Sequence, residues 1–123
     1  MGRTTSEGLI KSMEATVAVP ARRIVAHGAA DGTGVLATGP ATPIRGVSSE
    51  LDTAIGERIS VLMVGTIAEV EAGGAVTRGD PVTADAQGRA VVAAGGNRIV
   101  GYAEVSGVLG DIITVDVLPG YAV

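Results

Sequence analysis

The chain has 123 residues and a formal net charge of −4, and 46% of its residues are hydrophobic although it contains no Phe or Trp and only two Tyr. Its length suits a single domain with a core of Val, Ile, Leu, Ala and Met. The absence of cysteine excludes disulfides, thiolate metal ligands and a cysteine nucleophile. Negative charge opposes phosphate contact and the shortage of aromatic rings removes base-stacking platforms, so no nucleic-acid partner is expected.

The first 14 residues differ in character from the rest. They are mostly polar, with a small apolar group (Leu9, Ile10 and Met13) and the only lysine, Lys11. This apolar pattern is too short to hold a helix alone, so residues 1–14 are expected to form a flexible N-terminal arm; a helix packed on the β domain is the alternative. No apolar run is long enough for a signal peptide or a membrane span, which predicts a soluble protein made in the cytoplasm, with no membrane partner.

From residue 15 onward, short β-branched runs alternate with Gly, Pro, Asn and Asp, without sustained helical periodicity. This pattern predicts one all-β domain over residues 15–123. The expected strands are residues 15–19, 24–27, 34–37, 44–48, 58–64, 66–70, 81–84, 90–93, 99–104 and 111–118. Tight turns with positive φ are expected at Asp31-Gly32, at residues 85–88 and at Gly95-Gly96-Asn97. Residues 49–54 could make a single helical turn ended by Gly56.

The second half of the chain repeats much of the first at a spacing of 54 or 55 residues. The matching pairs are Ala21-Arg22-Arg23-Ile24-Val25 with Val76-Thr77-Arg78-Gly79-Asp80, Pro43-Ile44-Arg45-Gly46-Val47 with Arg98-Ile99-Val100-Gly101-Tyr102, and Gly56-Glu57-Arg58-Ile59-Ser60-Val61 with Gly110-Asp111-Ile112-Ile113-Thr114-Val115. This spacing predicts two tandem β repeats of about 55 residues, at about 15–65 and 66–120, that share one core. Gly46 and Gly101 occupy equivalent positions, so both are expected to be required by the fold.

Candidate catalytic and metal-binding residues are few. His27 is the only histidine, and although Asp31 lies nearby, a triad also needs an activated nucleophile. Without cysteine, a zinc or iron site would depend on carboxylates. Asp80 and Asp85 lack calcium-loop spacing and are interpreted as turn caps. The sequence therefore predicts neither an enzyme nor a metal or cofactor site.

Three short patterns also have structural explanations. The glycine-rich stretch from His27 to Gly34 lacks the lysine and helix of a phosphate-binding loop, so it is interpreted as a hairpin loop. Arg78-Gly79-Asp80 matches a cell-adhesion tripeptide, but it precedes Pro81 at a turn. A lipoyl- or biotinyl-carrier barrel would need a lysine at a hairpin tip, whereas Lys11 lies in the expected arm.

The second repeat carries a family resemblance. It contains Arg78-Gly79-Asp80-Pro81-Val82, Asp85-Ala86-Gln87-Gly88 and Ile99-Val100-Gly101-Tyr102-Ala103, and it closes with Gly110-Asp111-Ile112-Ile113-Thr114-Val115. Over about residues 17–118 the chain resembles the head decoration proteins, or capsid cement proteins, of tailed bacteriophages. In the first repeat, Ile24-Val25 replaces the Gly-Asp step. The motifs specify β-turns, and the family has no catalytic residues to transfer.

The resemblance implies a compact β-barrel or sandwich of β-tulip type with an extended N-terminal arm. It also implies a structural virion protein on the capsid exterior, whose partners are the major capsid protein and its own homotrimer. Such a protein binds at local threefold positions and stabilises the expanded head. The arm residues expected to contact the capsid are Arg3, Thr4, Thr5, Leu9, Ile10 and Met13.

Two other functions remain open at this stage. One is a trimeric β-rich fibre or carbohydrate-binding module of a phage particle, although sugar sites usually present aromatic faces and only Tyr102 and Tyr121 are available. The other is a small hydrolase or isomerase with a pocket between subunits, which would have to use His27.

Overall fold

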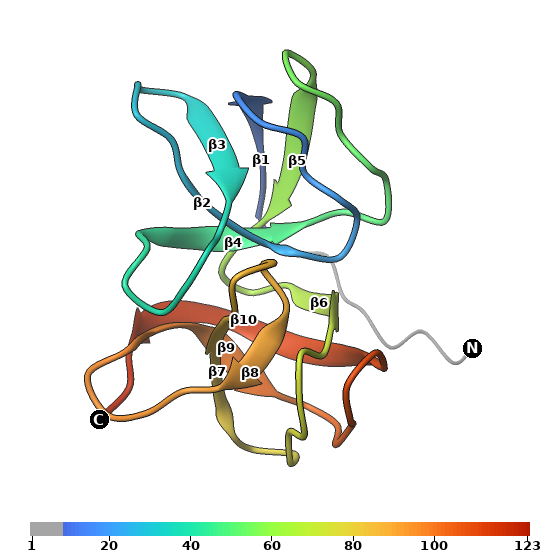
Figure 1. Ribbon diagram of the computed structural model, residues 1–123, viewed down its shortest axis with the longest axis vertical. Coiled ribbons are helices and arrows are strands. Elements are labelled where there is room, and N and C mark those ends of the chain that lie inside the picture. Colours follow the sequence, from blue (N-terminus) through green and yellow to red (C-terminus); the bar gives the residue numbers. More distant parts are fainter. Residues whose placement is uncertain (1–8) are drawn as a thin grey trace.

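The computed structural model describes residues 9–123, which form two five-stranded β-sheets and no helix (Figure 1). The first sheet is a closed barrel, in the order β1-β3-β2-β4-β5, of β1 (Ile10–Ala15), β2 (Ile24–His27), β3 (Thr33–Leu36), β4 (Ile44–Ser48) and β5 (Arg58–Leu62). The second has the order β6-β10-β9-β7-β8 and contains β6 (Ile67–Glu71), β7 (Pro81–Ala84), β8 (Ala90–Val92), β9 (Arg98–Ala103) and β10 (Ile112–Tyr121). The expected all-β fold is confirmed. Within residues 9–123, no helix could span a membrane.

Most strands lie where local sequence predicts them, and the first one does not. The strand expected at residues 15–19 is wrong: β1 ends at Ala15, and after it Val19 forms only an isolated bridge to Thr53. Met13 and Ala15 are buried in the barrel while Ser12 and Glu14 are exposed, which is the alternation of a half-buried strand. Residues 10–14 of the expected arm therefore belong to β1, and residues 1–8 lie outside the described part of the chain.

The two halves of the chain follow one pairing scheme. In the first half, β1 pairs with β5, β5 with β4, β4 with β2 and β2 with β3, and β1 also runs parallel to β3. In the second half, the corresponding pairs are β6–β10, β10–β9, β9–β7 and β7–β8, and a parallel bridge joins Ala72 to Ala90. The bridge between Val19 and Thr53 likewise has a counterpart between Val76 and Gly107. The tandem duplication remains a prediction, which this common scheme supports.

Local contacts refine which residues correspond. The backbone N–H of Ala21 donates to Asp52 Oδ1, and that of Arg78 donates to Ser106 Oγ, at the same place in each half. These contacts place Arg78 opposite Ala21, two residues from the alignment that the sequence suggests. The next residue in each half has positive φ, 56° at Arg22 and 93° at Gly79.

The core has two parts, and β2 contributes to both. Val25 points into the barrel, and Ile24 and Ala26 point out of it. The barrel interior consists of Met13, Ala15, Val19, Val25, Ile59, Val61 and Met63. The larger part lies between the barrel and the second sheet, where β4 packs near β6, β9 and β10 (Figure 1). The buried apolar side chains are Val, Ile, Ala and Met, whereas the expected Leu residues are absent from the core: Leu36 and Leu62 are only partly buried.

Gly46 and Gly101 allow close approach between neighbouring strands. A Cβ on Gly46 would overlap the carbonyl oxygen of Leu62 in β5, and a Cβ on Gly101 would overlap that of Asp116 in β10. β4 pairs with β5 as β9 pairs with β10. The two glycines therefore allow the same close strand approach in the two halves. Backbone atoms cannot move aside without breaking the strand pairing, and any side chain at either position is therefore excluded.

We expect Gly46→Ala and Gly101→Ala each to lower the free energy of unfolding by about 2–4 kcal/mol, because the new methyl group collides with backbone. Urea unfolding followed by circular dichroism measures this change. Gly39→Ala is the matched control, since nothing lies within 4 Å of a Cβ at that position. Equal midpoints for the control and either core variant would contradict the close approach.

Candidate functional site

The sequence candidates for catalysis lie in a hairpin. His27 is the exposed last residue of β2, and β2 pairs with β3 so that His27 lies opposite Gly34. Gly32, with φ of 76°, makes the turn, and Thr33 Oγ1 donates to the carbonyl of Ala30 at 2.6 Å. The hairpin interpretation of the glycine-rich stretch is confirmed. Among residues 9–123, no group of three or more His, Asp or Glu side chains is arranged to hold a metal ion.

The two aspartates interpreted as turn caps act as caps. Asp80 Oδ2 accepts the N–H of Thr77 at 2.9 Å. Asp85 Oδ1 accepts the N–H groups of Gln87 and Arg89, both at 2.9 Å. Within the adhesion-like tripeptide, the Asp80 carboxylate therefore stabilises its own turn.

The residues expected to contact the capsid fall into three groups. Leu9 and Ile10 are exposed, at 59% and 53%. Met13 is 1% exposed and packs inside the barrel, so it offers no surface for a partner. Arg3, Thr4 and Thr5 lie outside the described residues.

Leu9 and Ile10 lie beside a short strand edge. Residues 10–14 of β1 pair with β5, but β3 pairs only with the last two residues of β1. The Arg58 guanidinium donates to Ser12 Oγ at 2.9 Å and to the Ser12 carbonyl at 3.2 Å. A charged side chain thus covers part of the edge, which limits unspecific strand pairing. The exposed surface beside it is apolar at Ile10 and basic at Lys11.

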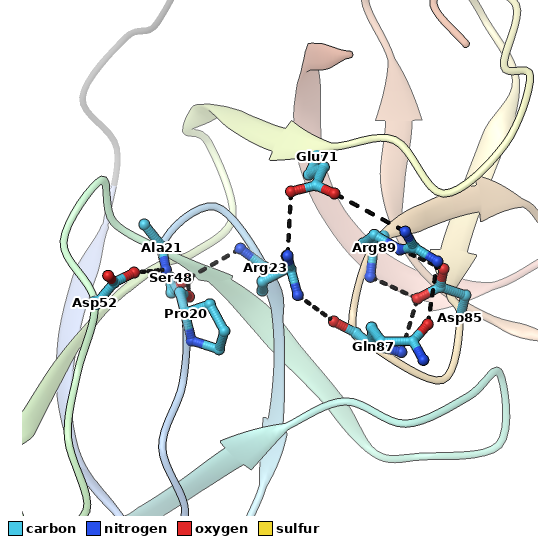
Figure 2. A network of polar contacts seen from close by, with 9 residues as sticks. All are labelled: Pro20, Ala21, Arg23, Ser48, Asp52, Glu71, Asp85, Gln87 and Arg89. Carbon is cyan, nitrogen blue, oxygen red and sulfur yellow. Dashed lines mark hydrogen bonds and ion pairs between the residues drawn. The ribbon is translucent and has the colours of Figure 1, made fainter. Parts of the chain in front are cut away.

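A polar junction, made of Arg23, Glu71, Asp85, Gln87 and Arg89, joins the two halves (Figure 2). Arg23 Nη2 contacts Glu71 Oε1 at 3.1 Å, and Arg23 Nη1 donates to the Gln87 carbonyl at 2.9 Å. Arg89 Nε contacts Asp85 Oδ2 at 2.9 Å, and Arg89 Nη1 lies 4.0 Å from Glu71 Oε2. Glu71 therefore lies between two guanidinium groups, one from each half of the chain.

Backbone hydrogen bonds and a buried serine fix the same junction. The N–H of Ile24 donates to the Gly88 carbonyl at 2.7 Å, and the N–H of Glu71 donates to the Arg22 carbonyl at 3.0 Å. Ser48 Oγ accepts the N–H of Arg23 and donates to the Pro20 carbonyl (Figure 2). Both backbone and side-chain hydrogen bonds therefore join the two halves.

Two loops, one in each half, present apolar side chains to solvent. Residues 49–57 form the first loop, with Leu51 and Ile55 exposed, and residues 104–111 form the second loop, with Val105, Val108 and Leu109 exposed. That these loops carry exposed aliphatic residues was not predicted from the sequence. The available signal was the spacing shared by Glu50-Leu51 before Ile55-Gly56 and Glu104-Val105 before Leu109-Gly110.

Two comparisons with known proteins found a match. The profile of a family described as phage cement protein matches residues 5–115. Among solved structures, the chain is similar to the head fiber gp8.5 N base of bacteriophage phi29, with 23% sequence identity and a TM-score of 0.68 over 89% of this chain and 93% of that chain. At this identity, the likeness shows the fold. No curated protein matches the sequence.

The polar junction generates a stability prediction. We expect Glu71→Gln to lower the free energy of unfolding by about 1–2 kcal/mol, because two guanidinium groups lose their shared carboxylate in a partly buried site. Glu69→Gln is the control: its ion pair with Arg22 is more than one third exposed on both sides, so the loss should stay below about 0.5 kcal/mol. Urea unfolding measures both. A Glu69→Gln effect as large as that of Glu71→Gln would show that the junction has no special role.

Proposed function

The chain belongs to the phage cement protein family and is a structural protein of the phage head on the capsid exterior, and we propose that it stabilises the expanded capsid by binding across neighbouring coat subunits. The observation that carries this proposal is the family match over residues 5–115. The likeness of the fold to the base of a phage head fiber supports it. The proposed partners are the major capsid protein and two further copies of this chain, as a homotrimer at local threefold positions.

The rigidity of the β domain suits this role. A protein that binds only the assembled shell shifts the assembly equilibrium towards that shell. The gain is largest when the bound protein keeps its contact points at fixed separation, because each contact then raises the effective concentration of the next. The apolar layer and the polar junction between the two halves supply such a fixed separation.

The proposed role needs no catalytic step, cofactor or nucleic acid. We propose a single β domain of two halves, at about 15–65 and 66–120, preceded by an N-terminal segment that contacts the capsid. Of the expected contact residues, the proposal keeps Arg3, Thr4, Thr5, Leu9 and Ile10. It leaves out Met13, whose side chain is buried in the barrel.

A second candidate is the base of a fibre, because the solved structure that the chain resembles is described as a head fiber base. Carbohydrate recognition by such a particle would need exposed aromatic faces. Tyr102 and Tyr121 are exposed, but Arg98 covers one face of the Tyr121 ring at 5.1 Å. The fibre-base role is therefore compatible with capsid binding, and the glycan-binding role has less support.

Co-sedimentation with phage heads tests the leading function. The purified protein should pellet saturably with expanded, undecorated heads of its own phage and should not pellet with unexpanded proheads, because the coat lattice has a different spacing before expansion. Bound protein should also raise the temperature at which the heads release DNA. Absence of binding to expanded heads would refute the capsid-binding proposal and leave glycan-array binding as the next measurement.

Two deletions test the N-terminal segment. Removal of residues 1–8 should leave the melting temperature nearly unchanged, because strand β1 and the buried Met13 are kept, and should weaken head binding at least tenfold, or ~1.4 kcal/mol. Removal of residues 1–14 is the contrasting control: it takes away most of β1 and the buried Met13, so the melting temperature should fall by several degrees. Unchanged head binding in the shorter deletion would contradict the contact proposed for Arg3, Thr4 and Thr5.

A further inference from the structure

The first and second loops are built by the same backbone contacts. In the first loop, Val19 and Thr53 exchange two backbone hydrogen bonds of 2.8 and 2.9 Å; in the second, Val76 and Gly107 exchange two of 2.9 Å. The N–H of Gly56 donates to the Ala15 carbonyl at 2.8 Å. In the second loop, the N–H of Gly110 donates to the Ala72 carbonyl at 2.9 Å. Each loop is thus hydrogen-bonded to its own half of the chain at two places.

An acidic side chain closes the tip of each loop. Glu57 Oε1 accepts the N–H of Ala54 at 2.8 Å, and Asp111 Oδ2 accepts the N–H of Val108 at 2.9 Å. Gly56 in the first loop and Gly110 in the second have φ of 84° and 90°. The two tips therefore have the same shape and are fixed before any partner arrives, which lowers the entropy lost on binding.

The side chains on these tips are aliphatic and exposed. Leu51 and Ile55 are 70% and 67% exposed, and Val105 and Leu109, at the corresponding positions, are 41% and 62% exposed. The fold gains little from side chains that remain in water. Other positions of the loops have diverged, such as Thr53 and its counterpart Gly107. Aliphatic residues at the same exposed positions of both halves indicate a shared contact surface.

We propose that the two loops form a paired contact in which Leu51 and Ile55 of the first loop, and Val105 and Leu109 of the second, insert into apolar depressions, edged by basic groups, on two neighbouring coat subunits. This inference rests on the proposed capsid-binding function and names the surface that performs it. The two loops lie in different halves of the molecule, the first loop (green) at the upper right of Figure 1 and the second loop (orange to red) at the lower right. One chain can therefore reach two subunits.

The acidic residues around the tips favour contact with a coat subunit over contact between the loops of two copies of this chain. Glu50, Asp52 and Glu57 are exposed around the first tip, and Glu104 and Asp111 around the second. Contact between loops of two copies would place these like charges opposite one another, which disfavours self-association. A surface with Lys or Arg around an apolar depression complements both tips. The first and second loops then bind the same kind of surface, one on each of the two coat subunits.

Contact size explains why both loops are needed. A stable protein interface buries roughly 800 Å² on each partner, far more than two aliphatic side chains supply. A single tip would bind weakly, but two tips on one rigid body make the second contact intramolecular. The polar junction that fixes the two halves therefore contributes to binding as well as to folding.

The experiment compares three variants of the full-length protein in co-sedimentation with expanded heads. The first carries Leu51→Ser and Ile55→Ser, the second carries Val105→Ser and Leu109→Ser, and the third carries all four changes. Each double variant should weaken binding at least tenfold, and the fourfold variant should not pellet. Melting temperatures should stay within a few degrees of the unmodified protein, because the changed side chains are exposed. Higher salt should weaken binding of the unmodified protein, because it screens the acidic tips.

The matched control carries Val64→Ser and Val92→Ser, at two exposed aliphatic positions outside the loops (49% and 46%), and should bind normally. If the unmodified protein does not bind heads, the capsid-binding function itself fails. If it binds and the fourfold variant binds equally well, the loop contact is refuted. An effect of only one double variant would overturn the paired contact. Loss of a self-associated form without heads, seen by analytical ultracentrifugation, would assign the loops to contacts between copies and refute the coat-subunit partner.

Discussion

The apolar layer between the barrel and the second sheet is the constraint on which the other features depend. It joins Ile24, Ala26 and Val47 of the first half to Val100 and residues of β10 in the second, so neither half covers its apolar surface alone. Burial of this layer supplies the main favourable free energy for joining the halves. The polar junction adds specificity at its border, because Arg23 and Glu71 from different halves must meet in one orientation. Short aliphatic side chains let the two sheets come close, while Gly46 and Gly101 let neighbouring strands approach within each sheet.

Local sequence predicted the elements whose signals are local. Strands at residues 24–27, 44–48 and 81–84 coincide with short β-branched runs between turn residues, and the requirement for Gly46 followed from its match with Gly101. The first strand was missed because its partner β5 lies more than forty residues away and its own segment is polar except at alternate positions. The polar junction could not be predicted from local sequence either, since Arg23 and Glu71 are 48 residues apart. Exposure of the loop aliphatics depends on tertiary packing that residue type alone does not give.

The family assignment and the physical features of the domain describe the same kind of protein. The proposed role is to bind across neighbouring coat subunits, and two sheets joined by a common core and by backbone hydrogen bonds suit that task. The resemblance seen in the sequence rested on turn residues, and those residues do shape the turns: Asp80, Asp85 and Gly88 form caps or adopt positive φ. The proposed contact surface is carried by other residues, mainly on loops, where side chains are free of packing constraints.

Closure of the barrel within residues 10–62 has a consequence for biosynthesis. The strands of the barrel leave the ribosome before those of the second sheet, so the hydrogen-bonded ring of the barrel can form first. The nascent barrel then displays Ile24, Ala26 and Ile44 without their cover. Only residues 63–66 separate β5 from β6. This short connection gives the second sheet, which covers these side chains, a high effective concentration as soon as it emerges. Many copies can thus be translated side by side in an infected cell while each chain covers its own apolar face.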